Sequence, residues 1–158
     1  MNEMHYTFRR LDAHNVETMR SLNSVFAEAF DDRDTYLEAP PSYEYLASLL
    51  SRQDFIALVA LADDTVVGGL IAYSLRKFEQ DRSEIYIYDL AVSTAHRRQG
   101  VAIGLIDALK RIARDRGAYV IYVQADKADA EAIALYKKIG GHQEAVFHFD
   151  IDPKHGRN

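Results

Sequence analysis

The sequence predicts a single domain of the α/β (α+β) class, in which helices flank a mixed central sheet. Its 158 residues and 48% hydrophobic content suffice for one core. Short apolar runs typical of strands alternate along the chain with segments whose apolar residues recur at helical spacing. Neither an internal repeat nor a low-complexity segment interrupts this alternation. The resulting order is β-α-α-β-β-β-α-β-α-β, which favours a mixed sheet.

The first third of the chain supplies one strand and two helices. Alternation predicts a short strand over residues 7–11, and helical spacing of apolar side chains predicts a helix over residues 16–30. Residues 28–38 contain five acidic residues and one arginine, which indicates an exposed loop. After a Pro-Pro pair, residues 42–52 have the pattern of a second amphipathic helix.

The middle of the chain predicts a hairpin, a strand and a long helix. Two apolar runs, residues 55–62 and 66–75, flank the turn Asp63-Asp64. Residues 84–92 are rich in Ile, Tyr and Val and are expected to form the next strand. An apolar stripe over residues 101–116 predicts a helix, which a glycine and basic residues in the last turn terminate.

The last third predicts a strand over residues 118–125, a helix over 129–139 and a final strand over 145–151. Asp129 is placed to cap this helix. We therefore expect one domain over residues 1–152 and a flexible tail over 153–158.

Composition restricts the function. The formal charge is −5, whereas a nucleic-acid partner would require a basic face, so we expect a cationic small molecule and no nucleic acid. The chain has no cysteine, which excludes thiolate catalysis, and its six scattered histidines give no metal-ligand spacing. Neither a signal peptide nor a membrane-spanning run is evident, so we expect a cytoplasmic protein without a membrane partner.

The string HRRQG lies where a strand is expected to pass into a helix. Backbone N–H groups at a helix N-terminus point at one small volume, and the helix dipole favours negative charge there. Gly100 would let a phosphate approach the backbone, Ala102 keeps the next contact small, and Arg97 and Arg98 could add charged hydrogen bonds. The string therefore suits a diphosphate. The alternative is two ordinary surface arginines before a turn glycine.

Together with its neighbours, this turn resembles the acetyl-coenzyme A site of the Gcn5-related N-acetyltransferases (GNAT). Arg97, Gly100 and Ala102 match the family signature Gln/Arg-x-x-Gly-x-Gly/Ala after a strand. The segment 129–140 resembles the second motif, Asn-x-x-Ala-x-x-Leu-Tyr-x-Lys-x-Gly, although Asp129 stands where Asn is usual. The resemblance implies a GNAT fold, acetyl-coenzyme A as co-substrate and no metal. The residues that it implies for the cofactor are Leu90, Ala91, Val92, Arg97, Arg98, Gln99, Gly100, Val101, Ala102, Asp129, Ala132 and Tyr136.

Within that family, the stretches RSEIYIYDLAV, HRRQG, GAYVIYVQAD and FHFDI resemble gentamicin-type aminoglycoside 3-N-acetyltransferases. This resemblance implies acetyl transfer to the 3-amino group of an aminoglycoside, hence antibiotic resistance, and a homodimer. The acidic charge balance agrees, since aminoglycosides are polycations. The alternatives are an N-acetyltransferase for another polyamine or a protein N-terminus, and a non-catalytic acyl-coenzyme A-binding domain.

Asp89 lies in an otherwise apolar strand, so its carboxylate must meet solvent in a cleft or be paired. We expect it to bind the acceptor ammonium and accept its proton; the alternative is a structural salt bridge. Alternation of period two places Ile87, Asp89 and Ala91 on one face of the strand, opposite Tyr88.

The resemblance also assigns the second catalytic role, since the family's tyrosine at the position of Tyr136 can protonate the departing thiolate. Composition alone would make Tyr136 a core residue, and positioning the cofactor is a further alternative. The residues expected to bind the acceptor are Asp31, Asp32, Tyr36, Tyr88, Asp89, Asp126 and Asp150. For the acidic loop, a solvated run of charge is an equally good interpretation.

Overall fold

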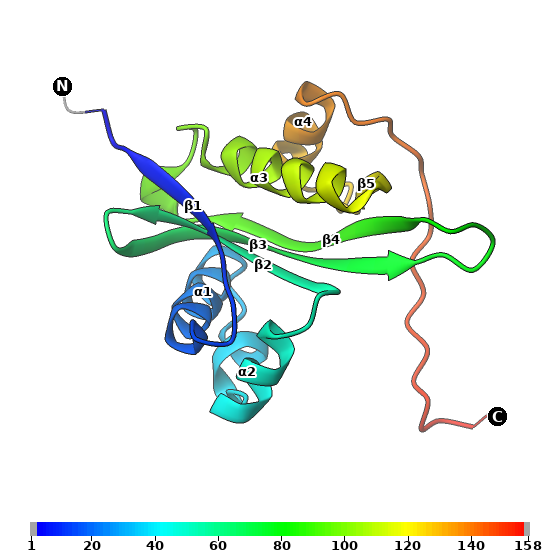
Figure 1. Ribbon diagram of the computed structural model, residues 1–158, viewed down its shortest axis with the longest axis horizontal. Coiled ribbons are helices and arrows are strands. Elements are labelled where there is room, and N and C mark those ends of the chain that lie inside the picture. The colour runs from blue at the N-terminus through cyan, green and yellow to red at the C-terminus, as the bar shows by residue number, and fades with distance from the viewer. Residues whose placement is uncertain (1–2, 157–158) are drawn as a thin grey trace. The chain divides into compact units, whose positions relative to one another are not determined.

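A five-stranded sheet organises the first part of the chain, with its strands in the order β1-β2-β3-β4-β5 (Figure 1). Neighbouring strands are antiparallel except for β4 and β5, which are parallel. The sheet is therefore mixed, and helices flank it, which confirms the predicted fold class. The strands are β1 (Tyr6–Arg10), β2 (Phe55–Ala62), β3 (Thr65–Arg76), β4 (Ser83–Val92) and β5 (Ala118–Val123).

The computed structural model describes residues 3–156, which fall into two units, Met1–Gln124 and Ala125–Asn158. The first unit contains the whole sheet and the α-helices α1, α2 and α3. The second contains one helix and the C-terminal segment. The tail predicted over residues 153–158 lies partly outside the described residues.

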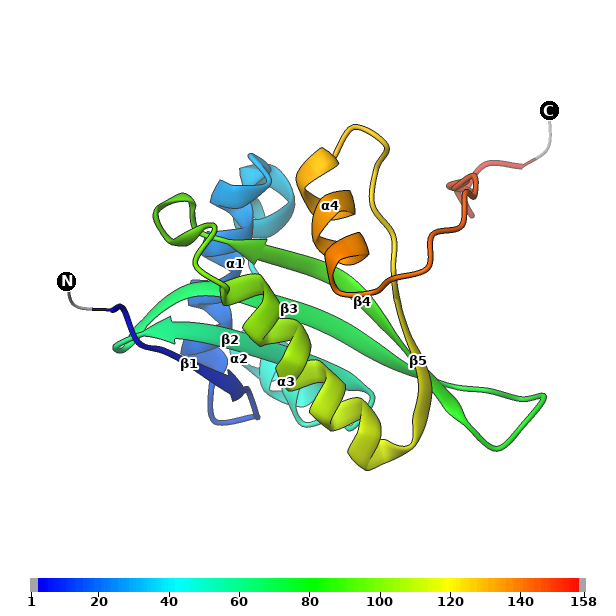
Figure 2. The same ribbon diagram turned by 90° about the horizontal axis from the view of Figure 1, so that it is seen from above.

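Helices cover both faces of the sheet. The helices α1 (Val16–Ala29) and α2 (Tyr43–Leu50) pack on one face, and α3 (Val101–Arg116) lies across the other (Figures 1 and 2). The core under α1 and α2 includes Leu22, Phe26, Leu50, Val59 and Ile71. On the other face α3 approaches β1 closely, because a Cβ on Gly104 would lie 2.1 Å from the ring of Phe8.

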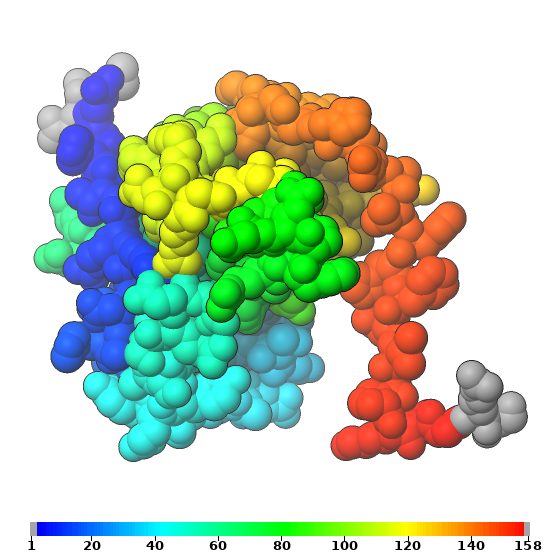
Figure 3. Space-filling view, turned by 45° about the vertical axis from the view of Figure 1, so that its right-hand side comes forward, coloured from blue at the N-terminus to red at the C-terminus, as the bar shows by residue number. Residues whose placement is uncertain are grey.

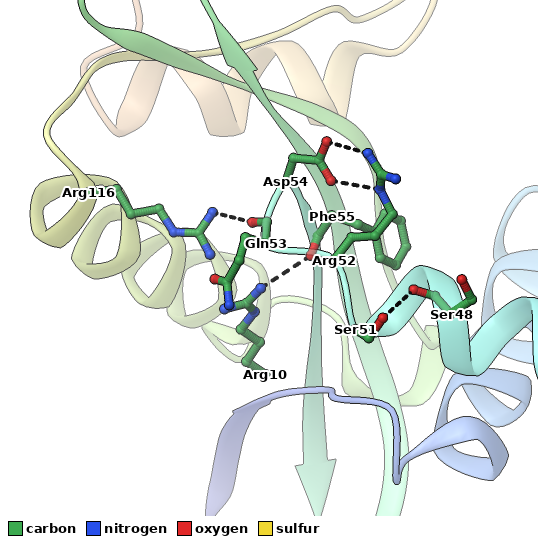
Figure 4. A network of polar contacts seen from close by, with 8 residues as sticks. All are labelled: Arg10, Ser48, Ser51, Arg52, Gln53, Asp54, Phe55 and Arg116. Carbon is green, nitrogen blue, oxygen red and sulfur yellow. Dashed lines mark hydrogen bonds and ion pairs between the residues drawn. The ribbon is translucent and has the colours of Figure 1, made fainter.

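Arginine side chains fix the loop between α2 and β2 (Figure 4). Arg116, at the end of α3, donates to the carbonyl of Gln53 (2.6 Å), and Arg10 donates to the carbonyl of Phe55 (3.3 Å). Burial and the charge of Arg116 lower the pKa of Arg10. These bonds tie the ends of β1 and α3 to the start of β2, opposite the end of the sheet where β4 leads into α3.

The strand β4 contains an irregularity that affects the site. Ile71 pairs with Asp89 and Ala72 pairs with Ile87, so Tyr88 is one extra residue, a β-bulge. The turn between β3 and β4 projects from the surface (Figure 3) and is held by ion pairs of Lys77 and Arg82 with neighbouring glutamates.

The second unit contains α4 (Ala130–Lys138), which begins as predicted at an aspartate cap. The strand predicted over residues 145–151 is wrong, since no strand follows β5 in the chain up to residue 156. Its apolar residues alternate as a strand requires, but a strand forms only by bonding to a neighbour, and these side chains are largely exposed. They are Val146, Phe147, Phe149 and Ile151. The observed order therefore ends at α4.

None of the helices in the described part of the chain has the length and apolar character needed to cross a bilayer.

Candidate active site

The end of β4 leaves part of its backbone open. β5 pairs with β4 only as far as Ile87, opposite Val123, whereas β3 follows β4 to Val92. From Tyr88 to Val92, the edge of β4 on the β5 side has no paired strand within the described residues. On this edge the carbonyl of Val92 accepts from Arg97 Nε (3.3 Å), and the rest of the edge is open to an extended ligand. Leu90, Ala91 and Val92, predicted to bind the cofactor arm, lie on this stretch.

The predicted diphosphate turn follows directly. Arg98 and Gly100 both have positive φ, of 58° and 80°, and α3 begins at Val101 without a side-chain cap. A Cβ on Gly100 would meet no atom within 4 Å, so the space beside the helix N-terminus is open. Uncapped N–H groups, a positive dipole end and the exposed guanidinium of Arg97 together form a place for an anion. The role of this turn in binding a diphosphate stays a prediction.

A side-chain cluster that the sequence did not reveal holds this turn against β1. The hydroxyl of Tyr6 donates to Gln99 Oε1 (2.7 Å) and lies 2.9 Å from His96 Nδ1. The single hydroxyl hydrogen is used on Gln99, so His96 Nδ1 donates to the Tyr6 oxygen. The amide of Gln99 is oriented by its other end, where Nε2 donates to the carbonyl of Ala95 (3.3 Å). Tyr6 is 90 residues from His96, so no local pattern could have indicated the contact.

Asp89 is held by a hydroxyl and has no ion-pair partner within the described residues. Tyr36 donates to its Oδ2 (2.9 Å) from a π-helical turn, Asp34–Glu38, inside the predicted acidic loop. Burial raises the pKa of Asp89, and the hydrogen bond from Tyr36 offsets part of this. Burial and the neighbouring carboxylate also raise the pKa of Tyr36. The salt-bridge alternative for Asp89 therefore finds no support in the structure.

The predicted division of β4 into two faces holds for Asp89 and Ala91, which pair with Ile71 and Gly69, but it is wrong before Asp89 because of the bulge. Ile87 and Asp89 pair with successive residues of β3, which point to opposite faces, so they do not share a face. Tyr88 instead packs edge-on against Tyr73 and Tyr86, with ring centroids 5.9 Å apart in each pair. Period-two alternation fails here because one residue of β4 has no partner in β3.

The acidic loop is partly a scaffold. Asp32 Oδ1 accepts from the backbone N–H of Thr35 (3.1 Å), in the first turn of the π-helical segment. The ring of Tyr36 packs on Phe26 and Phe30, with centroids 5.7 and 5.8 Å away. Asp31 is exposed just after α1. Of the residues expected to bind the acceptor, the structure thus brings together Tyr36, Tyr88 and Asp89.

The second unit carries the other expected residues. The carboxylate of Asp129 accepts from the backbone N–H of Ala132 (3.0 Å), so aspartate performs the cap at this position of the motif. Burial, followed by the charge of Asp129, raises the pKa of Tyr136 to about 12. Asp126 is exposed. Asp150 is exposed too and lies 2.9 Å from the imidazole of His148, outside any strand.

The known proteins that this chain is similar to are acetyltransferases. A family model for the acetyltransferase (GNAT) family matches residues 17–141. The crystal structure of an aminoglycoside acetyltransferase, HMB0005, from an uncultured soil metagenomic sample is 52% identical, with a TM-score of 0.92 over 94% of this chain and 99% of that one. A second such enzyme, meta-AAC0020, crystallised in complex with sisomicin, is 31% identical, with a TM-score of 0.88 over 94% of this chain and 97% of that one.

Curated relatives are more distant. N-acetyltransferase 8B of Rattus norvegicus is 30% identical over 82 residues, which cover 52% of this chain and 37% of the rat protein. The chain thus spans less than two fifths of the length of this relative.

Proposed function

Because the chain belongs to the acetyltransferase (GNAT) family, we propose that it transfers acetyl from acetyl-coenzyme A to the 3-amino group of an aminoglycoside. The observation that carries the proposal is Asp89, a partly buried carboxylate that has no ion-pair partner among the described residues and lies beside an open stretch of strand backbone. The likeness to two aminoglycoside acetyltransferases supports the acceptor class. The 3-position rests on the resemblance of β4, the following turn and β5 to the 3-N-acetyltransferases.

The donor fits the first unit in two places. The edge of Leu90, Ala91 and Val92 that β5 leaves unpaired can bond the pantetheine arm as an additional strand would, with the Val92 carbonyl exchanging its bond from Arg97 for one from the ligand. The diphosphate can lie on the N-terminus of α3, where backbone N–H groups of the first turn are uncapped. Arg97, Arg98, Gln99, Gly100, Val101 and Ala102 form this turn. When bound, the donor supplies a thioester whose carbonyl carbon the acceptor amine attacks.

Asp89 is proposed to accept the proton of the acceptor amine. An ammonium must lose a proton before nitrogen can attack, and a carboxylate whose pKa is raised is a better base than an ordinary one. A carbon–nitrogen bond forms, the carbon–sulfur bond breaks, and the amine proton leaves through Asp89. Tyr36 keeps the carboxylate oriented by its hydrogen bond.

Tyr136 is proposed to donate a proton to the departing sulfur. A pKa of about 12 keeps its hydroxyl protonated at neutral pH, as an acid that must donate to a thiolate requires. Ala132, one helical turn before it, is small enough to leave room for the donor. Asp129 fixes the start of this helix. The remaining acids, Asp31, Asp32, Asp126 and Asp150, are proposed to attract the other ammonium groups of the acceptor.

The test is release of coenzyme A thiol from acetyl-coenzyme A, with gentamicin, spermidine and a short peptide offered separately. We expect turnover with gentamicin and little with the other two, and the product's NMR spectrum should show acetyl on the 3-amino nitrogen. Turnover with spermidine alone, or with the peptide alone, would show that the acceptor is another polyamine or a protein N-terminus and not an aminoglycoside. Tight coenzyme A binding without turnover on any amine would indicate a binding domain.

The resemblance also implies a homodimer, which we propose for this chain. Sedimentation equilibrium at micromolar concentration tests it, and a monomer mass at every concentration would contradict it.

A further inference from the structure

A row of four tyrosine rings crosses three strands next to Asp89. Tyr86 and Tyr122, from β4 and β5, stack nearly parallel with centroids 4.7 Å apart. Tyr88 packs edge-on against Tyr86 and against Tyr73 of β3. We call these four rings the tyrosine strip. It lies wholly in the first unit.

The strip differs from the rest of the same sheet face. Where α1 and α2 cover that face, it carries buried aliphatic residues, but Tyr73 and Tyr88 are 37% and 62% exposed. The bulge brings Asp89 onto the face of this strip, since regular alternation after Tyr86 and Tyr88 would turn its carboxylate to the other face. A structural cross-strand pair needs no such irregularity, whereas bulges often re-aim a side chain at a binding site.

The strip has an unbalanced charge at one end. Asp89 lies close enough to contribute to the raised pKa of Tyr73 and of Tyr86. The carboxylate near the other end, Glu84, is already bonded to Lys77 and to the hydroxyl of Tyr119. Among the described residues, Asp89 is therefore the carboxylate left to bind a cation beside the rings.

Rings next to a lone carboxylate recognise a ligand with a flat C–H face and an ammonium group. Aromatic faces attract both apolar C–H surfaces and cations. Asp89 and Tyr86 pair with β3 residues that are two positions apart, so they lie roughly 7 Å from each other along the strand. Tyr122 pairs with Tyr86 on the neighbouring strand, about 5 Å further across the sheet. This span exceeds one six-membered ring and suits two linked rings.

We propose that the tyrosine strip binds the sugar ring attached to the aminocyclitol of the acceptor, while Asp89 holds an ammonium of the aminocyclitol itself. The inference rests on the proposed function and adds a specificity site to it. Tyr88 contacts the ring nearest Asp89, and Tyr122 contacts the second ring.

The experiment compares a one-ring ligand, 2-deoxystreptamine, with a two-ring ligand, neamine, by calorimetric titration and by steady-state kinetics. The variant Tyr122→Leu should raise the Kd and KM for neamine about tenfold and leave 2-deoxystreptamine within twofold. The variant Tyr88→Leu should weaken both ligands. Tyr122→Phe retains the ring and should behave as the wild type, and all variants should keep the wild-type Kd for coenzyme A.

Tyr119→Leu is the matched control, since Tyr119 is a half-exposed ring of the same strand whose face is occupied by Arg82. It should change neither ligand. An unchanged neamine Kd in folded Tyr122→Leu would overturn the proposed role of the tyrosine strip. If Tyr122→Leu does not fold, an unchanged neamine Kd in Tyr88→Leu would overturn it. Equal losses for both ligands in Tyr122→Leu would also overturn it. A wild-type protein that acetylates no aminoglycoside would instead show that the proposed function is wrong.

Discussion

At the scale of single residues, Asp89 combines a functional charge with a cost in stability. Its pKa is raised in the folded protein, so folding favours the protonated form and the ionised form opposes folding. This stabilising contribution is complete below the ordinary pKa of 3.8 and is lost as the pH rises through the raised value. A residue that is costly to ionise at neutral pH is typical of an active site.

We therefore expect Asp89→Asn to abolish most of the activity yet raise the melting temperature at neutral pH by about 2 °C. The gain should shrink toward pH 4, where the wild-type carboxyl becomes protonated. In the wild type, kcat/KM should fall as the pH drops through the raised pKa. Calorimetric melting and rate profiles over pH 4–8 measure both effects. If the Asp89→Asn variant is active, Asp89 is not the general base, and that role passes to Asp126, to Asp150 or to water.

Tyr136 allows a cleaner separation of chemistry from packing. The variant Tyr136→Phe keeps the ring and loses only the hydroxyl, so kcat should fall tenfold to roughly ten-thousandfold while the Kd for coenzyme A stays within twofold. Stopped-flow single-turnover rates with a saturating acceptor measure the chemical step. A normal rate would return Tyr136 to a packing role.

At the scale of elements, the turn before α3 depends on a strand far away in sequence. Tyr6 of β1 bonds both His96 and Gln99, so the backbone that presents the helix N-terminus is clamped at its outer side. Clamping matters because an anion site of N–H groups requires the turn to be fixed before the ligand arrives.

The variant Tyr6→Phe should raise the Kd for coenzyme A twofold to about tenfold, the worth of one or two neutral hydrogen bonds. Its kcat/KM with S-acetylpantetheine, which lacks the diphosphate, should not change. Tyr43→Phe is the control, because Tyr43 is a half-exposed tyrosine on α2, on the opposite face of the sheet from α3. If Tyr6→Phe lowers kcat/KM with S-acetylpantetheine as well as with acetyl-coenzyme A, Tyr6 has a general structural role and does not act through the diphosphate turn.

At the scale of the whole molecule, the sequence predicts best what depends on local periodicity. The helix α3 runs over the predicted residues 101–116, since its apolar stripe and terminal glycine are local signals. The bulge at Tyr88 and the contacts of Tyr36 and Tyr6 arise from pairing between distant segments, which no periodicity records. The strand expected over 145–151 has the right alternation, but alternation cannot supply a neighbouring strand.

Net charge is also a property of the whole chain, and it leads to a final prediction. With a formal charge of −5 and no ion-pair partner for Asp89 among the described residues, the protein should capture polycations electrostatically. Raising the salt from about 0.05 to 0.5 M should weaken neamine binding by roughly tenfold, because screening shortens the reach of each charge.

The slope of log Kd against log salt should be steeper for neamine than for 2-deoxystreptamine, which carries fewer ammonium groups. It should be shallower in Asp89→Asn, since one attracting charge has been removed. Equal slopes for both ligands would show that salt acts on the protein and not on the attraction. Binding that ignores salt altogether would leave the tyrosine strip and hydrogen bonds, not charge, as the source of affinity.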